Sequence, residues 1–83
     1  MPTVHRQEGF RVIVNTDDHR PAHVHCVRGD AVVIVNLATE RAAATLRESN
    51  KQAKHNDLAD AVRIVNENDH KLWNAWRFYH GDD

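Results

Sequence analysis

The sequence predicts an α+β fold, with a mainly antiparallel sheet of four or five strands and a C-terminal amphipathic helix packed on one face. Short apolar runs flank Glu8-Gly9 and Gly29-Asp30, pairs that suit the tight turns of two consecutive hairpins. Toward the end of the chain, apolar residues instead recur at the spacing of one helical face. A chain of 83 residues suffices for one domain, so residues 1–83 are expected to form a single domain.

Four segments are expected to form the strands of these hairpins. The first hairpin joins a short strand around Val4 to FRVIV, residues 10–14. The second joins AHVHCVR, residues 22–28, to AVVIVNL, residues 31–37. All four segments contain the β-branched residues that favour strands.

Side chains in AHVHCVR alternate between the two faces of the expected strand. His23 and His25 therefore share one face, and Val24 and Cys26 share the other. The face with Val24 and Cys26 is expected to meet the core, which leaves the histidine face more open. Cys26 points away from both histidines, so it is interpreted as a small buried residue rather than a nucleophile.

The segment from Ala38 to Lys54 supports two interpretations. Its alanine-rich and charged composition favours a helix, while ATLRE, residues 44–48, is equally consistent with a fifth strand at the sheet edge. Both interpretations stay open from the residues alone.

The last part of the chain is predicted to be helical from about Asn56 to His80. Asn56 suits the N-cap, and Gly81 suits the end of the helix. Residues 66–69, NEND, are weak helix formers, so a kink or a break into two helices is expected there.

Composition limits the classes of function. The formal net charge is −1, so there is no bulk basic field, and any RNA or DNA site must be a local patch. Cys26 is the one cysteine, and no signal-peptide pattern opens the chain, so a reducing cytoplasm is the expected compartment. No apolar run approaches the ~20 residues of a membrane-spanning helix, so no membrane role is expected.

DDHRPAHVHC, residues 17–26, places three histidines close together and is the main candidate site. In one interpretation, His19, His23 and His25 bind zinc or a similar divalent metal, with Asp17 or Asp18 as a further ligand or as the carboxylate that orients an imidazole. The spacing lacks the confirming pattern of a zinc finger.

A second interpretation is acid–base chemistry on a phosphodiester. His23 and His25 would take and give a proton, while Arg11, and also Arg47, would stabilise the negative charge of a phosphate. A third interpretation assigns no function, because the histidines can equally be solvated side chains of a loop and an exposed sheet face.

KLWNAWRFYH, residues 71–80, carries more aromatic residues than one helix face needs. Trp76 is expected to pack against the sheet. Trp73, Phe78 and Tyr79 are expected to leave an accessible surface that binds a partner protein or a second copy of the chain.

Four stretches give the sequence a family resemblance: MPTV at the start, GFRVIV, DDHRPAHVHC, and AW near the end of the last helix. It resembles a family of small bacterial proteins of unknown function with the motif D-H-x-P-P-H-V-H. Asp18, His19, Pro21, His23, Val24 and His25 match this motif. Ala22 replaces its second proline, and Cys26 stands where an aliphatic residue is common.

The resemblance implies a role in a two-gene, toxin–antitoxin-like module, with a cognate small protein encoded nearby. It also favours the fifth strand near ATLRE. The leading functional prediction is therefore a module component that acts on or near nucleic acid through His19, His23 and His25, and whether it is an enzyme stays open. The alternatives are a non-catalytic protein-interaction module and a small metal-binding protein.

Overall fold

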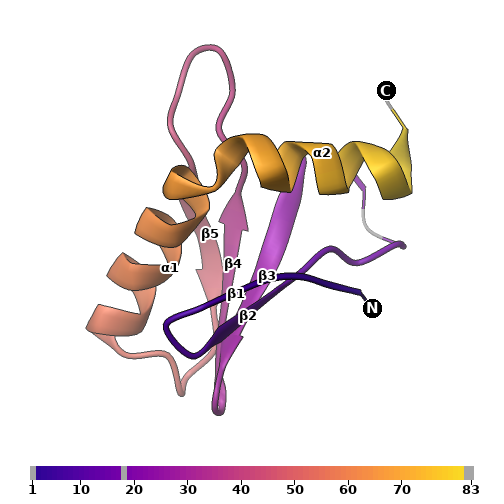
Figure 1. The fold of residues 1–83 in the computed structure, drawn as a ribbon. Coiled ribbons are helices and arrows are strands. Elements are labelled where there is room, and N and C mark those ends of the chain that lie inside the picture. Colours follow the sequence, from indigo (N-terminus) through magenta and orange to yellow (C-terminus); the bar gives the residue numbers. More distant parts are fainter. Residues whose placement is uncertain (1, 18, 82–83) are drawn as a thin grey trace.

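The computed structural model describes residues 2–17 and 19–81, which form five strands followed by two helices (Figure 1). The strands are β1 (Thr3–Gln7), β2 (Phe10–Ile13), β3 (His23–Arg28), β4 (Ala31–Asn36) and β5 (Thr45–Ser49). The helices are α1 (His55–Glu67) and α2 (Asp69–His80). Each strand pairs antiparallel with the next along the chain, in the order β1-β2-β3-β4-β5. The predicted α+β class and both hairpins are confirmed.

The first hairpin turns at Glu8 and Gly9, which have φ angles of 52° and 82°. Two consecutive positive φ angles give the backbone twist that matches the twist of the flanking strands. Glu8 carries this angle although it is not glycine, so the tight two-residue loop decides its conformation. The predicted turn thus has the geometry that its sequence suggests.

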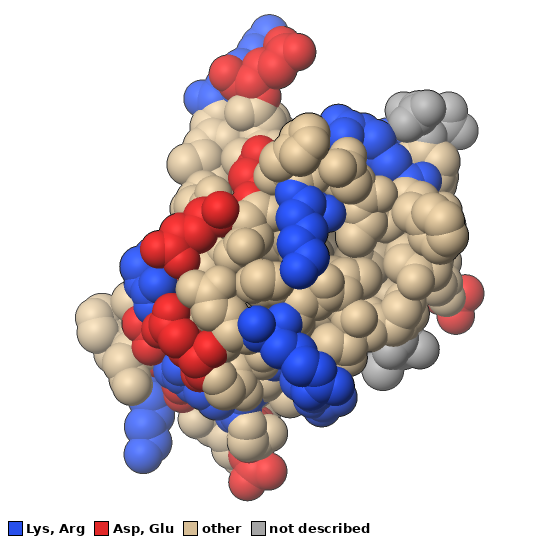
Figure 2. Space-filling model, viewed as in Figure 1, with Lys and Arg blue, Asp and Glu red and all other residues tan. Residues whose placement is uncertain are grey.

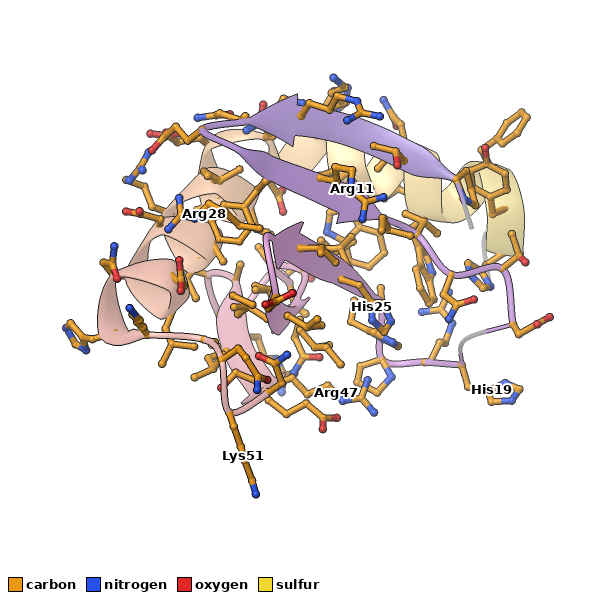
Figure 3. All side chains as sticks on the ribbon, turned by 90° about the horizontal axis from the view of Figure 1, so that it is seen from below. Arg11, His19, His25, Arg28, Arg47 and Lys51 are labelled. Carbon is orange, nitrogen blue, oxygen red and sulfur yellow. The ribbon has the colours of Figure 1, made fainter. Side chains whose placement is uncertain are left out.

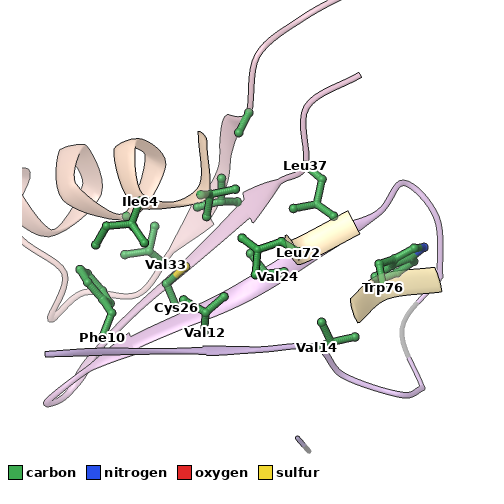
Figure 4. Packing of buried hydrophobic residues seen from close by; sticks show 14 of the residues in the cluster. Phe10, Val12, Val14, Val24, Cys26, Val33, Leu37, Ile64, Leu72 and Trp76 are labelled. Carbon is green, nitrogen blue, oxygen red and sulfur yellow. The ribbon is translucent and has the colours of Figure 1, made fainter. Parts of the chain in front are cut away.

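Both helices contribute side chains to one apolar core on one face of the sheet (Figure 4). Val12, Val24, Cys26, Val33 and Val35 are fully buried on the sheet side. From the helices, the fully buried side chains are Ala61, Ile64, Val65 and Leu72, with Trp76 at 1% exposure. The predicted core face of β3, with Val24 and Cys26, is confirmed.

Residues 45–49 form the fifth strand, β5, and the helical interpretation of the segment from Ala38 to Lys54 is wrong. All five residues of β5 are exposed, as expected of an edge strand. Pairing with β4 gives hydrogen-bond partners to the backbone on one side of β5. A short helix in this segment would leave the amides of its first turn and the carbonyls of its last turn without partners inside the helix. Helix α2 holds the loop between β4 and β5 in place, because Trp73 Nε1–H donates to the Ala38 carbonyl at 2.7 Å.

The predicted single helix is broken into two at Asn68, within the NEND stretch where a break was expected. The Asn68 side chain donates to the Ile64 carbonyl at 2.8 Å and to Gln7 Oε1 at 3.0 Å, which holds the break against β1. The N-cap is Lys54 rather than Asn56, because the Asp57 carboxylate accepts from the Lys54 amide at 2.9 Å. Gly81 ends α2 with φ 78°, as predicted. Within the described residues, neither helix is long and apolar enough to cross a membrane.

Arg28, the last residue of β3, joins the sheet to the start of α1. Its Nη2 lies 2.6 Å from Asp57 Oδ1 and 3.1 Å from Asp60 Oδ2. Its guanidinium also lies over the Phe10 ring, 4.1 Å from the ring centroid. One side chain therefore holds together the first hairpin, the central strand and α1.

This contact predicts that stability falls with acidification. The Lys54 amide and then the Arg28 guanidinium hold the pKa of Asp57 below its ordinary value. A carboxyl whose pKa is lower in the folded state stabilises the fold above its unfolded pKa, and this contribution is lost as pH falls toward the folded pKa. The melting temperature, followed by circular dichroism from about pH 6 to about pH 3, should fall less steeply in Asp57→Asn than in the wild type.

Asp30→Asn is the matched control, because Asp30 is an exposed carboxylate in the turn between β3 and β4. It should keep the wild-type pH dependence. An Asp57→Asn variant that loses stability on acidification as steeply as the wild type would contradict the assigned role of Arg28 and Asp57.

Candidate functional site

The open face is the face of the sheet opposite the helices, and the strand register places two rows of side chains on it. Both rows cross the strands at right angles. One row runs from β2 to β5 through Ile13, His25, Ile34 and Glu48. The next row runs through Arg6, Arg11, Val27 and Val32. The open face thus combines aliphatic side chains with arginine and histidine.

His23 and His25 lie together on this face, with ring centroids 5.4 Å apart. His25 is half-buried, but His23 is 5% exposed, so the expectation of an open histidine face is wrong at this residue. Its ring lies 5.7 Å from the ring of Trp76, and its Nδ1 lies 2.8 Å from the Pro21 carbonyl oxygen. His23 therefore links the site to the core, while the ring of His25 is the more accessible of the two.

Arg47 reaches the histidines from an irregularity in β5. Ile34 pairs with Glu48 and Val35 pairs with Leu46, so Arg47 is the extra residue of a β-bulge. Bulges redirect side chains and occur often beside functional sites. The result is that Arg47 Nη1 lies 3.0 Å from His23 Nδ1.

The contact between Arg47 and His23 is exchangeable. A single Nδ1 either donates to the Pro21 carbonyl or accepts from the guanidinium, but cannot do both at once. When Nδ1 carries the hydrogen, Pro21 remains its partner, and the guanidinium can turn to another acceptor. Arg47 is therefore able to bind an external anion without leaving His23 unsatisfied.

The arginines around α1 differ in their ion pairs from the two arginines beside His25. Arg28 and Arg63 form ion pairs with carboxylates around α1, and Figure 2 shows acidic and basic side chains interleaved on that side. Arg11 and Arg47 are exposed and form no ion pair with any carboxylate in residues 2–17 and 19–81. Figure 3 shows His25 between these two arginines. Their charge is therefore available to a ligand that carries negative charge.

The structure brings together part of the predicted metal set. His23 and His25 lie close together, whereas His19 is exposed, and Figure 3 shows it on the loop, away from His25. Asp18 lies outside the described residues. Within those residues, no three or more histidine, cysteine or carboxylate side chains are grouped to hold a metal ion. A zinc site made of these residues remains a prediction from the sequence.

Cys26 takes no part in the site. It is fully buried on the core face of β3, and this burial raises the pKa of its thiol to about 12. A thiol that stays protonated at neutral pH is a poor nucleophile. The interpretation of Cys26 as a small core residue agrees with this environment.

Three polar side chains of the open face were missed from the sequence, and Arg6, beside Arg11, is one of them. Asn36 lies directly opposite His23, and its Oδ1 is buried without a hydrogen-bond partner among the described residues. Glu48 lies opposite Ile34 on the neighbouring strand. Asn36 occurs two residues after Ile34, and this period of two is the signal that could have placed it on the open face.

The aromatic surface of α2 has the predicted exposure. Phe78 is 80% exposed and Tyr79 is 38% exposed, and their rings meet edge to face at 4.9 Å. Trp73 is half-buried, and the Arg77 guanidinium lies 5.1 Å from its ring centroid. Binding of a partner or a second copy by Trp73, Phe78 and Tyr79 remains a prediction.

Comparison with known proteins adds a family but no activity. No curated protein and no solved structure matches the chain significantly. A family profile matches residues 9–77, a range that runs from the first turn through most of α2 and includes both histidines of the open face. The chain therefore belongs to the family described as a domain of unknown function (DUF4160).

Proposed function

We propose that this protein binds single-stranded RNA on the open face of its sheet, as one component of a two-gene, toxin–antitoxin-like module. The observation that supports this most is the position of Arg47, an exposed side chain whose Nη1 lies 3.0 Å from Nδ1 of the buried His23. The module itself is supported by the sequence resemblance alone.

Phosphate is the ligand that this arrangement suits. A guanidinium offers a planar fork of N–H donors that matches two phosphate oxygens. Arg11 on β2 and Arg47 on β5 lie on either side of His25 (Figure 3), so a phosphate bound at His25 would accept from both sides. The overall charge of −1 does not oppose this, because Asp57, Asp60 and Glu67 lie on α1 and pair with other arginines.

The shape of the face favours a single strand over a duplex. The major groove of duplex DNA admits a helix or a two-stranded ribbon, whereas the open face is a broad sheet surface. Unstacked bases of single-stranded RNA can instead lie across exposed strands while arginines contact the backbone. RNA in an unpaired conformation is therefore the proposed ligand.

The close approach of the two imidazoles supports a second candidate function, RNA cleavage by proton transfer. Rings 5.4 Å apart, one of them half-buried, place two proton carriers beside the proposed phosphate position. Cleavage that survives a chelator and has a bell-shaped pH dependence would support it. Cleavage or folding that requires zinc would support the metal-binding alternative instead.

Salt dependence tests the proposed binding function. The fluorescence anisotropy of a short labelled RNA should show binding that weakens as salt rises. If Arg6, Arg11 and Arg47 each neutralise one phosphate, the slope of log K against log salt should be about −2, from about −0.7 per phosphate.

A folded protein that fails to bind the RNA at low salt, or binds with no salt dependence, would contradict the proposal. The protein-interaction module would then be the better account. Sedimentation of the chain alone and with its gene neighbour would test that alternative.

A further inference from the structure

A shallow groove lies beside Arg47, where β4 and β5 meet. Val32, Ile34, Glu48, Ser49 and Asn50 line it, and its volume is about 360 Å³. Ile34 links the groove to the histidine site, because it pairs with His25 on one side and with Glu48 on the other. A ligand that contacts His25 can therefore continue into the groove without leaving the sheet.

The strand spacing sets the span from His25 to Glu48. Neighbouring strands lie about 4.8 Å apart, so two spacings separate these residues by roughly 10 Å. This is comparable with the extent of one nucleotide from its phosphate to the far edge of its base. A phosphate at His25 and Arg47 would therefore place the edge of its base near Glu48.

Among the described polar side chains that line the groove, Glu48 is the charged one that is available to a ligand. The Asn50 amide is already occupied, since it donates to the Asp30 carbonyl at 2.8 Å and accepts from the Val32 amide at 3.0 Å. Glu48 is exposed and forms no hydrogen bond or ion pair with another described residue. Val32 and Ile34 supply the aliphatic surface on which a flat base can rest.

A carboxylate distinguishes the four RNA bases by their hydrogen-bonding edges. Guanine presents two adjacent donors, N1–H and N2–H, which match the two carboxylate oxygens. Adenine and cytosine present an amino donor beside a ring nitrogen lone pair, which repels the carboxylate. Uracil presents one N–H between two carbonyl oxygens. Guanine is therefore the base that Glu48 suits best.

We propose that this groove binds a guanine base of the RNA and that Glu48 is the residue that determines this specificity. The inference rests on the proposed RNA-binding function and adds the base that the face selects. Arg11 and Arg47 hold the backbone, which carries no sequence information, and Glu48 supplies the contact that does.

The test compares oligo(A) with the same RNA carrying one central guanosine, by anisotropy of a fluorescent label. The wild type should bind the guanosine-containing RNA about tenfold more tightly, the discrimination typical of one good bidentate contact. In Glu48→Gln this preference should fall below about twofold, because an amide presents one acceptor and one donor. Its affinity for oligo(A) should stay the same or rise, since a negative charge is removed.

Glu40→Gln is the matched control, because Glu40 is an exposed carboxylate on the loop before β5. It should keep the wild-type preference. Equal binding of both RNAs by the wild type, or an unchanged preference in Glu48→Gln, would overturn the guanine assignment while RNA binding by the open face stands. Failure of the folded wild type to bind either RNA would overturn the RNA-binding function and the guanine assignment together.

Discussion

Replacing Trp76 by alanine is expected to lower the free energy of unfolding by about 3–5 kcal/mol, the usual cost of truncating a buried aromatic residue. Trp76 is 1% exposed, and its ring stacks on His80 at 3.9 Å and lies 5.7 Å from His23. A chain of 83 residues buries a modest share of its surface, so its total stability is small. Most of that stability should therefore be lost.

Urea denaturation followed by circular dichroism measures this change. Phe78→Ala is the matched control, because Phe78 lies on the same helix but is 80% exposed. The control should change stability by no more than about 0.5 kcal/mol. Similar urea midpoints for the two variants would contradict the claim that the buried Trp76 side chain contributes much of the stability of the core.

Replacing both Arg11 and Arg47 by methionine is expected to weaken RNA binding by at least about a hundredfold at low salt. Each charge-assisted hydrogen bond contributes about 1.5–3 kcal/mol, and the double variant removes the proposed phosphate contacts on both sides of His25. Methionine keeps much of the aliphatic length of each side chain. Neither arginine pairs with a carboxylate in the described part of the chain, so the fold should be preserved.

Anisotropy measures the affinity, and thermal unfolding checks that the double variant is folded. Arg41→Met is the matched control, because Arg41 is exposed on the loop between β4 and β5, outside the open face. Wild-type affinity in the folded double variant would contradict the assigned role of Arg11 and Arg47. A loss of affinity in Arg41→Met as large as in the double variant would show that the binding responds to charge alone.

Local sequence signals predicted most of the fold. Glu8-Gly9 and Gly29-Asp30 marked the hairpins because turn chemistry depends on the residues of the turn itself. The weak helix formers near Asn68 marked the break between the helices for the same reason. β5 could not be decided from composition, since an exposed edge strand has no buried face and hence no clear period of two.

The sequence predicted the part of the site that depends on local strand geometry, and missed the part that depends on contacts between distant residues. Alternation along β3 placed His23 and His25 on one face. The burial of His23 depends on Trp76, which is distant in the sequence, and so could not be read from the strand. The approach of Arg47 to His23 depends on a β-bulge in the pairing of β5 with β4. The bulge is a property of the two paired strands, so the sequence of β5 alone does not predict it.

The most direct test of RNA binding by the open face is an NMR titration of the ¹⁵N-labelled protein with the guanosine-containing RNA. Amide shifts should change along the row that contains His25, Ile34 and Glu48, and at Arg11 beside it, while α1 stays unchanged. Shift changes confined to α1 and α2, or none at RNA concentrations that saturate the anisotropy signal, would contradict binding on the open face.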